Sequence, residues 1–167
     1  MSANINIGQD TSGQEITIDL EELLATRLLV QGNSGSGKSH LLRRILEECA
    51  GLVQQVVIDP EGDFASLADH FGHVVIDGAA YSAPEIEALA ARVRQHRASV
   101  VLALDELEVE QQIRCVATMP ARPRFRPRHM RLVIADNVKR RVSSLISPAA
   151  DGANICASST TTSAGNQ

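Results

Sequence analysis

The run Leu28-Leu29-Val30-Gln31-Gly32-Asn33-Ser34-Gly35-Ser36-Gly37-Lys38-Ser39-His40 decides how the rest of the chain is interpreted. Its pattern predicts a buried strand, then a glycine-rich turn, then the start of a helix. Residues 32–39 fit G-x-x-x-x-G-K-[ST], the phosphate-binding P-loop. Glycines let the backbone adopt positive φ and approach an anion, and successive N–H groups at a helix N-terminus then bind it. The run therefore predicts a nucleotide site.

Individual residues of this loop have expected roles. Lys38 should reach the β- and γ-phosphates, and the Ser39 hydroxyl should bind Mg²⁺. The other predicted nucleotide-binding residues are Gly32, Asn33, Ser34, Gly35, Ser36, Gly37 and His40. A chance match in a Gly/Ser-rich loop is the alternative, but an apolar strand precedes the loop and an amphipathic helix follows it. The sequence has no guanine-reading Asn/Thr-Lys-x-Asp pattern, which favours ATP over GTP.

Composition indicates a soluble, cytoplasmic protein with one aliphatic core. The chain has 167 residues, with three Phe, one Tyr and no Trp. No apolar run approaches the roughly 18 residues that a membrane helix needs, and the N-terminus lacks the regions of a signal peptide. Cys49, Cys115 and Cys156 are far apart and have no metal-site spacing, which suits reduced thiols.

Charge divides the chain into two parts. Residues 1–111 hold seven Lys/Arg against 18 Asp/Glu, whereas residues 112–167 hold nine against two. The predicted organisation is a hairpin and lead-in, a P-loop core, a basic Arg/Pro-rich segment with one further strand, and a disordered tail, at residues 1–26, 27–118, 119–147 and 148–167. The basic segment fits a nucleic-acid arm and an exposed linker about equally well.

Strand and helix patterns alternate through the core. Buried strands are expected at residues 28–31, 56–59, 73–77, 99–104 and 132–136. Helices are expected after the first strand, between the third and fourth strands, and after the fourth strand. Continuous apolar strands that alternate with helices indicate a parallel α/β sheet. The predicted fold class is therefore α/β, a P-loop NTPase with a mostly parallel sheet and an N-terminal β-hairpin.

Two strand ends compete for the magnesium-binding acid. Residues 100–104 are apolar and precede Asp105 and Glu106, which fits a metal-binding acid followed by a water-orienting Glu. Residues 132–135 precede Asp136, but Asn137 stands where a Glu is expected. The local pattern favours Asp105 for the metal and Glu106 for catalysis. A third acidic turn, residues 59–64, fits the ligand side of the sheet, although a solvated turn is slightly favoured there.

Two motifs in order resemble one family. The P-loop run, together with Val56-Val57-Ile58-Asp59-Pro60-Glu61-Gly62-Asp63-Phe64, resembles the HerA-type ATPases of the HerA/FtsK DNA translocase superfamily. The resemblance covers roughly residues 5–113. It implies a RecA-like core, ATP hydrolysis, a hexameric ring of identical chains and DNA pumping. It also implies that the magnesium acid follows the later strand, which makes Asp136 the metal-binding and catalytic candidate.

The expected function is an ATP-binding, HerA-like translocase or helicase core. Asn137 and the change of charge near residue 118 suggest a truncated or frame-shifted member, so hydrolysis is expected to be weak or absent. A non-hydrolysing nucleotide-binding or regulatory protein is the first alternative. A small P-loop kinase is the second, and the turn at residues 59–64 argues against it.

Overall fold

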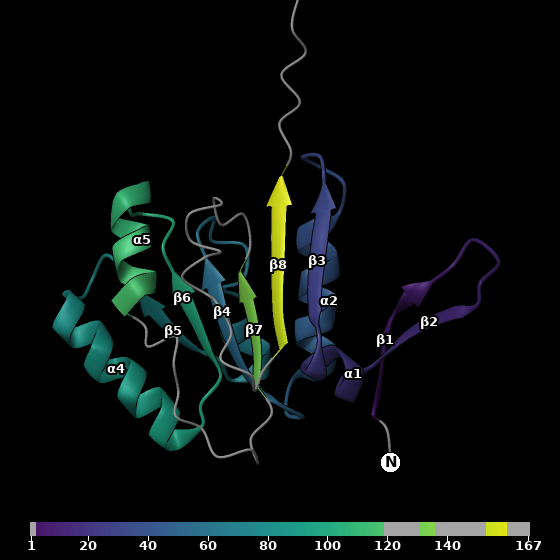
Figure 1. The fold of residues 1–167 in the computed structure, drawn as a ribbon, viewed down its shortest axis with the longest axis horizontal. Helices are drawn as coiled ribbons and strands as arrows, with labels where there is room; N and C mark the ends of the chain where they lie inside the picture. Colours follow the sequence, from purple (N-terminus) through teal and green to yellow (C-terminus); the bar gives the residue numbers. More distant parts are fainter. Residues whose placement is uncertain (1–2, 119–130, 136–152, 160–167) are drawn as a thin grey trace, which may run out of the picture.

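The computed structural model describes residues 3–118, 131–135 and 153–159. Its centre is a six-stranded sheet in which every neighbouring pair is parallel, in the order β3-β8-β7-β4-β6-β5 (Figure 1). The sheet strands are β3 (Arg27–Gly32), β4 (Gln54–Asp59), β5 (Val74–Asp77), β6 (Val100–Ala103), β7 (Arg131–Ala135) and β8 (Ala153–Ser159). This arrangement confirms the predicted parallel α/β fold.

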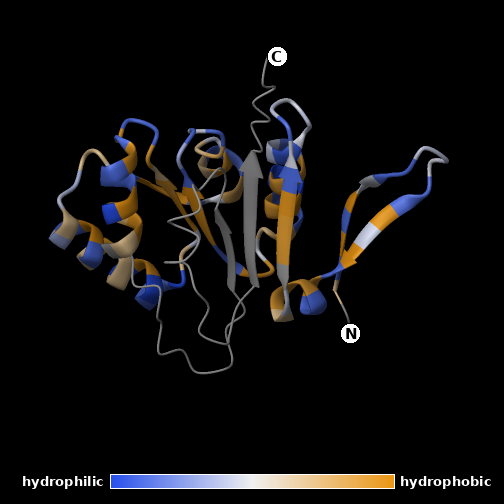
Figure 2. Cartoon of the chain, turned by 45° about the horizontal axis from the view of Figure 1, so that its top comes forward, coloured by the Kyte–Doolittle hydropathy of each residue, from blue (hydrophilic) through white to orange (hydrophobic). Residues whose placement is uncertain are grey.

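Helices cover both faces of the sheet because alternate strand residues point to opposite sides. The helices are α1 (Leu20–Ala25), α2 (Lys38–Cys49), α3 (Leu67–Phe71), α4 (Ala83–His96) and α5 (Val109–Thr118). Val57 and Val101 pack in one apolar cluster with side chains of α1, α2 and α3. The adjacent residues Ile58, Val100 and Leu102 pack in a second cluster with α4 and α5. Hydrophobic residues accordingly follow the strands, whereas the loops at the carboxyl ends are hydrophilic (Figure 2).

An antiparallel hairpin precedes the sheet, as predicted. It consists of β1 (Asn4–Gln9) and β2 (Glu15–Asp19) and extends to one side of the molecule (Figure 1). Ile5 is buried against the α2 side of the sheet, which fixes the base of the hairpin. The Asp19 carboxylate then begins α1 by accepting hydrogen bonds from the N–H groups of Glu21 (2.8 Å) and Glu22 (3.2 Å).

The predicted capping box starts α4. The Glu85 carboxylate accepts hydrogen bonds from the Ser82 N–H at 2.8 Å and the Ser82 hydroxyl at 2.6 Å. This satisfies a backbone donor that the first helical turn would otherwise leave open.

Among the described residues, no helix is both long enough and apolar enough to cross a membrane.

One prediction for the C-terminal part is wrong. The composition of residues 148–167 predicts a disordered tail, but Ala153–Ser159 forms β8 between β3 and β7. β8 pairs with a strand on each side, and these backbone hydrogen bonds stabilise it. Its mostly small or polar side chains do not predict a strand from sequence. The predicted strand at 132–136 is present as β7. The basic residues 119–130, the site candidates Asp136 and Asn137, and the rest of the tail lie outside the described residues.

Candidate functional site: the P-loop and the carboxyl edge of the sheet

The P-loop lies between β3 and α2, at the carboxyl edge of the sheet. Gly35 has φ +76° and Gly37 has φ +88°, backbone conformations that side chains with a Cβ rarely adopt. Gly37 is the N-cap of α2, and its carbonyl accepts the first helical hydrogen bond from the Leu41 N–H at 3.0 Å. No acidic residue lies in the first turn of this helix, so its positive end is uncompensated.

Lys38 is buried although it is charged. Only 9% of its surface is exposed, and its Nζ donates to the Asn33 carbonyl at 3.1 Å. The Ser36 N–H donates to the same carbonyl, also at 3.1 Å, which closes the turn of the loop. An ammonium group has three donors, so Nζ keeps capacity for an incoming anion. A buried cation behind a turn of backbone N–H groups is the arrangement that a phosphate requires.

Gly32 gives the loop its close packing. A Cβ built at this position would overlap Ser36 Oγ and lie 3.1 Å from Ser36 Cβ. The loop therefore folds back onto the last residue of β3. These features fit a nucleotide phosphate, and they would let the Ser39 hydroxyl, in the first turn of α2, hold its Mg²⁺.

The remaining predicted nucleotide-binding residues lie in the same loop or in the first turn of α2. Asn33, Ser34 and Ser36 are exposed, as is His40 in the first turn of α2. At such exposed positions the groups available to a ligand are the main-chain N–H groups, and not buried side chains. The structure thus brings together every predicted nucleotide-binding residue from Gly32 to His40.

The turn after β4 is built around a buried carboxylate. Asp59 is fully buried, and its Oδ1 accepts from the N–H groups of Gly62 (2.9 Å) and Asp63 (3.0 Å), while Oδ2 accepts from Phe64 N–H (2.8 Å). Burial raises the pKa of the Asp59 carboxyl, and the three backbone donors oppose that rise. The solvated turn favoured from sequence is therefore wrong for Asp59, although Glu61 and Asp63 are exposed.

The order of strands separates the two candidate magnesium acids. Between β3 and β7 lies one strand, β8, whereas β8, β7 and β4 lie between β3 and β6. At about 4.8 Å per strand, β7 is about 10 Å from the P-loop strand and β6 about 19 Å. Asp105, just after β6, lies beside the β4 turn, where a Cβ on Gly62 would be 3.3 Å from its carboxyl group.

The metal candidates therefore do not form one site among the described residues. Asp105 and Glu106 are both exposed at the end of β6, away from Ser39. Within residues 3–118, 131–135 and 153–159, no group of three or more His, Cys, Asp and Glu side chains could hold a metal. Asp136 directly follows β7 in the sequence.

Arg43 is a candidate functional residue that no sequence motif indicated. It lies on α2, and its guanidinium donates to the Asp63 carbonyl and to Ser66 Oγ (3.0 Å) while it covers the Phe64 ring at 5.9 Å. Nothing in the local sequence signals this, because its partners are 20 or more positions away. Arg43 fastens the P-loop helix to the acidic turn after β4.

A family model matches most of the chain. The model describes the central domain of the helicase HerA and matches residues 5–144. The chain belongs to the HerA central-domain family. It is thus a HerA-type P-loop ATPase domain, as its two motifs implied, and the family uses ATP, usually with Mg²⁺. No curated protein sequence matches the chain.

Two solved structures share the fold. VirB4 of Thermoanaerobacter pseudethanolicus aligns with a TM-score of 0.55 and 10% identity, over 94% of this chain and 77% of that chain. The cytoplasmic domain of the type VII secretion ATPase EccC of Thermomonospora curvata aligns with a TM-score of 0.51 and 19% identity. That alignment covers 95% of this HerA-type chain but 19% of EccC. At these identities the likeness concerns the fold.

Proposed function

We propose that this chain binds ATP with Mg²⁺ at the P-loop and serves as the nucleotide-binding core of a cytoplasmic, DNA-handling HerA-type motor. The observation that carries the proposal is the buried Lys38 ammonium, held behind a loop in which Gly35 and Gly37 adopt positive φ. Lys38 would neutralise the β- and γ-phosphates, and Ser39 would hold the metal. The metal supplies charge neutralisation at the transferred phosphoryl group when it is bound.

Asp136 is the proposed second magnesium residue. It follows β7, the nearer of the two candidate strands to β3, so its carboxylate has the shorter distance to cover. Asp105 and Glu106 follow the farther strand and are the alternative. In this proposal the neighbouring Asn137 occupies the position of the water-orienting Glu.

An amide cannot accept a proton as a carboxylate base does, so slow hydrolysis is proposed for the chain alone. The second candidate function, a nucleotide-binding protein that does not hydrolyse ATP, is favoured by the same residue. In a ring of identical chains, a neighbour would supply the arginine that neutralises the transition state. The arginines of residues 122–131 would contact the phosphates of DNA.

Two substitutions separate the catalytic assignments. Asn137→Glu should raise steady-state ATP turnover, because it restores a carboxylate beside Asp136. Glu106→Gln should leave both turnover and ATP affinity unchanged, because this residue follows the distant β6. If Glu106→Gln abolishes a measurable turnover and Asn137→Glu changes nothing, the assignment to β7 is wrong. Calorimetry with ATP and Mg²⁺, with and without duplex DNA, tests binding and its dependence on DNA.

A further inference from the structure

The P-loop helix carries two separate contacts along its length. Its first residue, Lys38, belongs to the phosphate loop, and Arg43 follows five residues later. At 1.5 Å per residue, the two lie about 7.5 Å apart along the helix axis. One rigid element therefore connects the nucleotide loop to the residue that holds the turn after β4.

Arg43 contacts the turn at several points. It donates to the Asp63 carbonyl and to Ser66 Oγ, and it packs over the ring of Phe64. Glu47, one helical turn further along, approaches the Arg43 guanidinium at 4.0 Å. Phe64 itself is fully buried in the apolar cluster that contains Leu42 and Ile45 of α2. Polar and apolar contacts thus join α2 to the same few residues.

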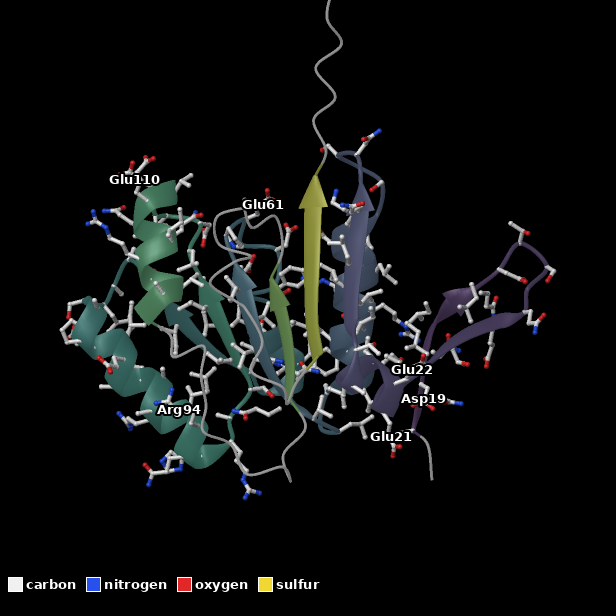
Figure 3. The ribbon with its side chains drawn as sticks, viewed as in Figure 1. Asp19, Glu21, Glu22, Glu61, Arg94 and Glu110 are labelled. Atoms are coloured by element: carbon white, nitrogen blue, oxygen red, sulfur yellow. The ribbon has the colours of Figure 1, made fainter. Side chains whose placement is uncertain are left out.

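Hydrogen bonds within the turn hold it closed. The Asp59 carboxylate accepts hydrogen bonds from the N–H groups of residues 62–64, and an open turn would lose these three bonds. Glu61, on the outside of this closure, points away from the sheet at its carboxyl edge (Figure 3). Closed and locally opened forms of such a turn can exchange while the remaining fold persists.

The turn also stands beside the proposed catalytic strand. Ile58 of β4 pairs with Ala135 of β7, so the two strands end within one residue of each other. Residues 59–64 therefore leave the sheet beside the point where Asp136 follows β7 in the sequence. A change in this turn would act beside the carboxyl end of β7.

We propose that Arg43 is a positioning residue that couples nucleotide occupancy of the P-loop to closure of the 59–64 turn. The coupling rests on the proposed nucleotide site. A bound phosphate anchors the first turn of α2 through backbone N–H groups, Lys38 and Ser39, which restricts the motion of the second turn that carries Arg43. A more fixed Arg43 holds the Asp63 carbonyl and Ser66 hydroxyl for more of the time and favours the closed turn.

Coupling between two events is reciprocal. If the nucleotide stabilises the closed turn by some factor, closure of the turn must strengthen nucleotide binding by the same factor. Typical coupling energies correspond to about 5-fold or more. An arginine that merely stabilises the turn would instead change its opening equally with and without nucleotide. The ratio between these two conditions is therefore the quantity to measure.

Arg44 provides a matched control on the same helix. It also pairs with a glutamate four residues later, Glu48, at 2.8 Å, but its Nε donates to the Asn6 carbonyl of β1 (3.1 Å). Arg44→Ala thus removes a similar ion pair and a similar backbone contact directed at the hairpin. Arg43→Lys keeps the charge but loses the planar group that covers Phe64.

The test is hydrogen exchange of the full chain, followed by mass spectrometry, with and without Mg²⁺ and a slowly hydrolysed ATP analogue. In the unsubstituted chain and in Arg44→Ala, the nucleotide should slow exchange at residues 62–64 by about 5-fold or more. In Arg43→Ala the nucleotide should still bind, without slowing that exchange, and its affinity should fall by the same factor. Arg43→Lys should be intermediate.

The outcomes separate this proposal from the nucleotide site itself. An unsubstituted chain that binds no nucleotide overturns both. Normal binding with an unchanged nucleotide response in Arg43→Ala, or an equal loss in Arg44→Ala, overturns the coupling alone. If Arg43→Ala fails to fold, Ser66→Ala removes one acceptor of Arg43 and should reduce the response, and an undiminished response there would refute the role of Arg43.

Discussion

Replacing Gly32 by alanine tests whether the shape of the P-loop, and not only its charge, creates the nucleotide site. The new Cβ would overlap Ser36 Oγ and lie 3.1 Å from Ser36 Cβ, a contact too short for either atom to remain in place. Rotation of the serine hydroxyl relieves the first overlap but not the second. Gly32 does not have positive φ, so an alanine meets a packing problem there and not a backbone one.

The magnitude follows from the cost of overpacking. One added methyl group in a closely packed site typically costs about 1–3 kcal/mol. If the loop relieves this cost by leaving its phosphate-binding shape, the Kd for ATP should rise by about 5- to 150-fold. Calorimetric titration with Mg²⁺ and a slowly hydrolysed ATP analogue measures the change, and a thermal melt checks that the fold persists.

A second substitution makes this prediction strict. Ser36→Gly removes both atoms that the new methyl group meets, so Gly32→Ala with Ser36→Gly should bind ATP within a few-fold of the unsubstituted chain. Ser36→Gly alone controls for the extra backbone freedom of glycine. The packing argument fails if Gly32→Ala binds normally, or if the double variant binds as poorly as Gly32→Ala alone.

Three further outcomes are expected. Lys38→Ala should abolish most ATP binding in a folded protein, and unchanged affinity in a calorimetric titration would contradict the site. Because burial lowers the pKa of His73, the unfolded chain binds more protons below about pH 6.5, so the free energy of unfolding should fall as the pH drops through that value. Urea titrations at several pH values measure this fall, which His73→Gln should flatten. Ser82→Ala should cost about 1 kcal/mol of stability by urea titration, and no change would count against the cap of α4.

The sequence predicted the elements whose side chains carry a periodic signal. The P-loop strand and helix, the hairpin and the capping box at Ser82 are each recognisable from a local pattern, and each is present. By contrast, β8 has the sequence Ala-Asn-Ile-Cys-Ala-Ser-Ser, in which Ile155 is the single β-branched residue and the other side chains are small or polar, unlike those typical of strands. It forms because β3 and β7 leave a place between them, and that place is a property of the whole sheet.

The burial of the carboxylate after β4 also could not be predicted from the local sequence pattern. Asp59, Glu61 and Asp63 are similar in sequence, and each could be a solvated turn residue. Only Asp59 is buried, because the chain turns back at Gly62, where φ is +79°, and brings three N–H groups to one carboxylate. Arg43 completes the arrangement from a helix that precedes the turn.

The acid after β6 illustrates why a strand-end motif cannot by itself identify a metal residue. Asp105 follows an apolar strand, as a magnesium-binding acid would, yet its carboxyl group lies against Gly62 of the β4 turn. The Leu104 N–H beside it donates to the Asp59 carbonyl at 2.9 Å, so this end of β6 is joined to the turn. An acidic residue here can therefore be explained by packing beside a glycine, without a ligand. In a parallel sheet all carboxyl ends face one edge, and the order of the strands, which the sequence does not state, decides which acid lies near the P-loop.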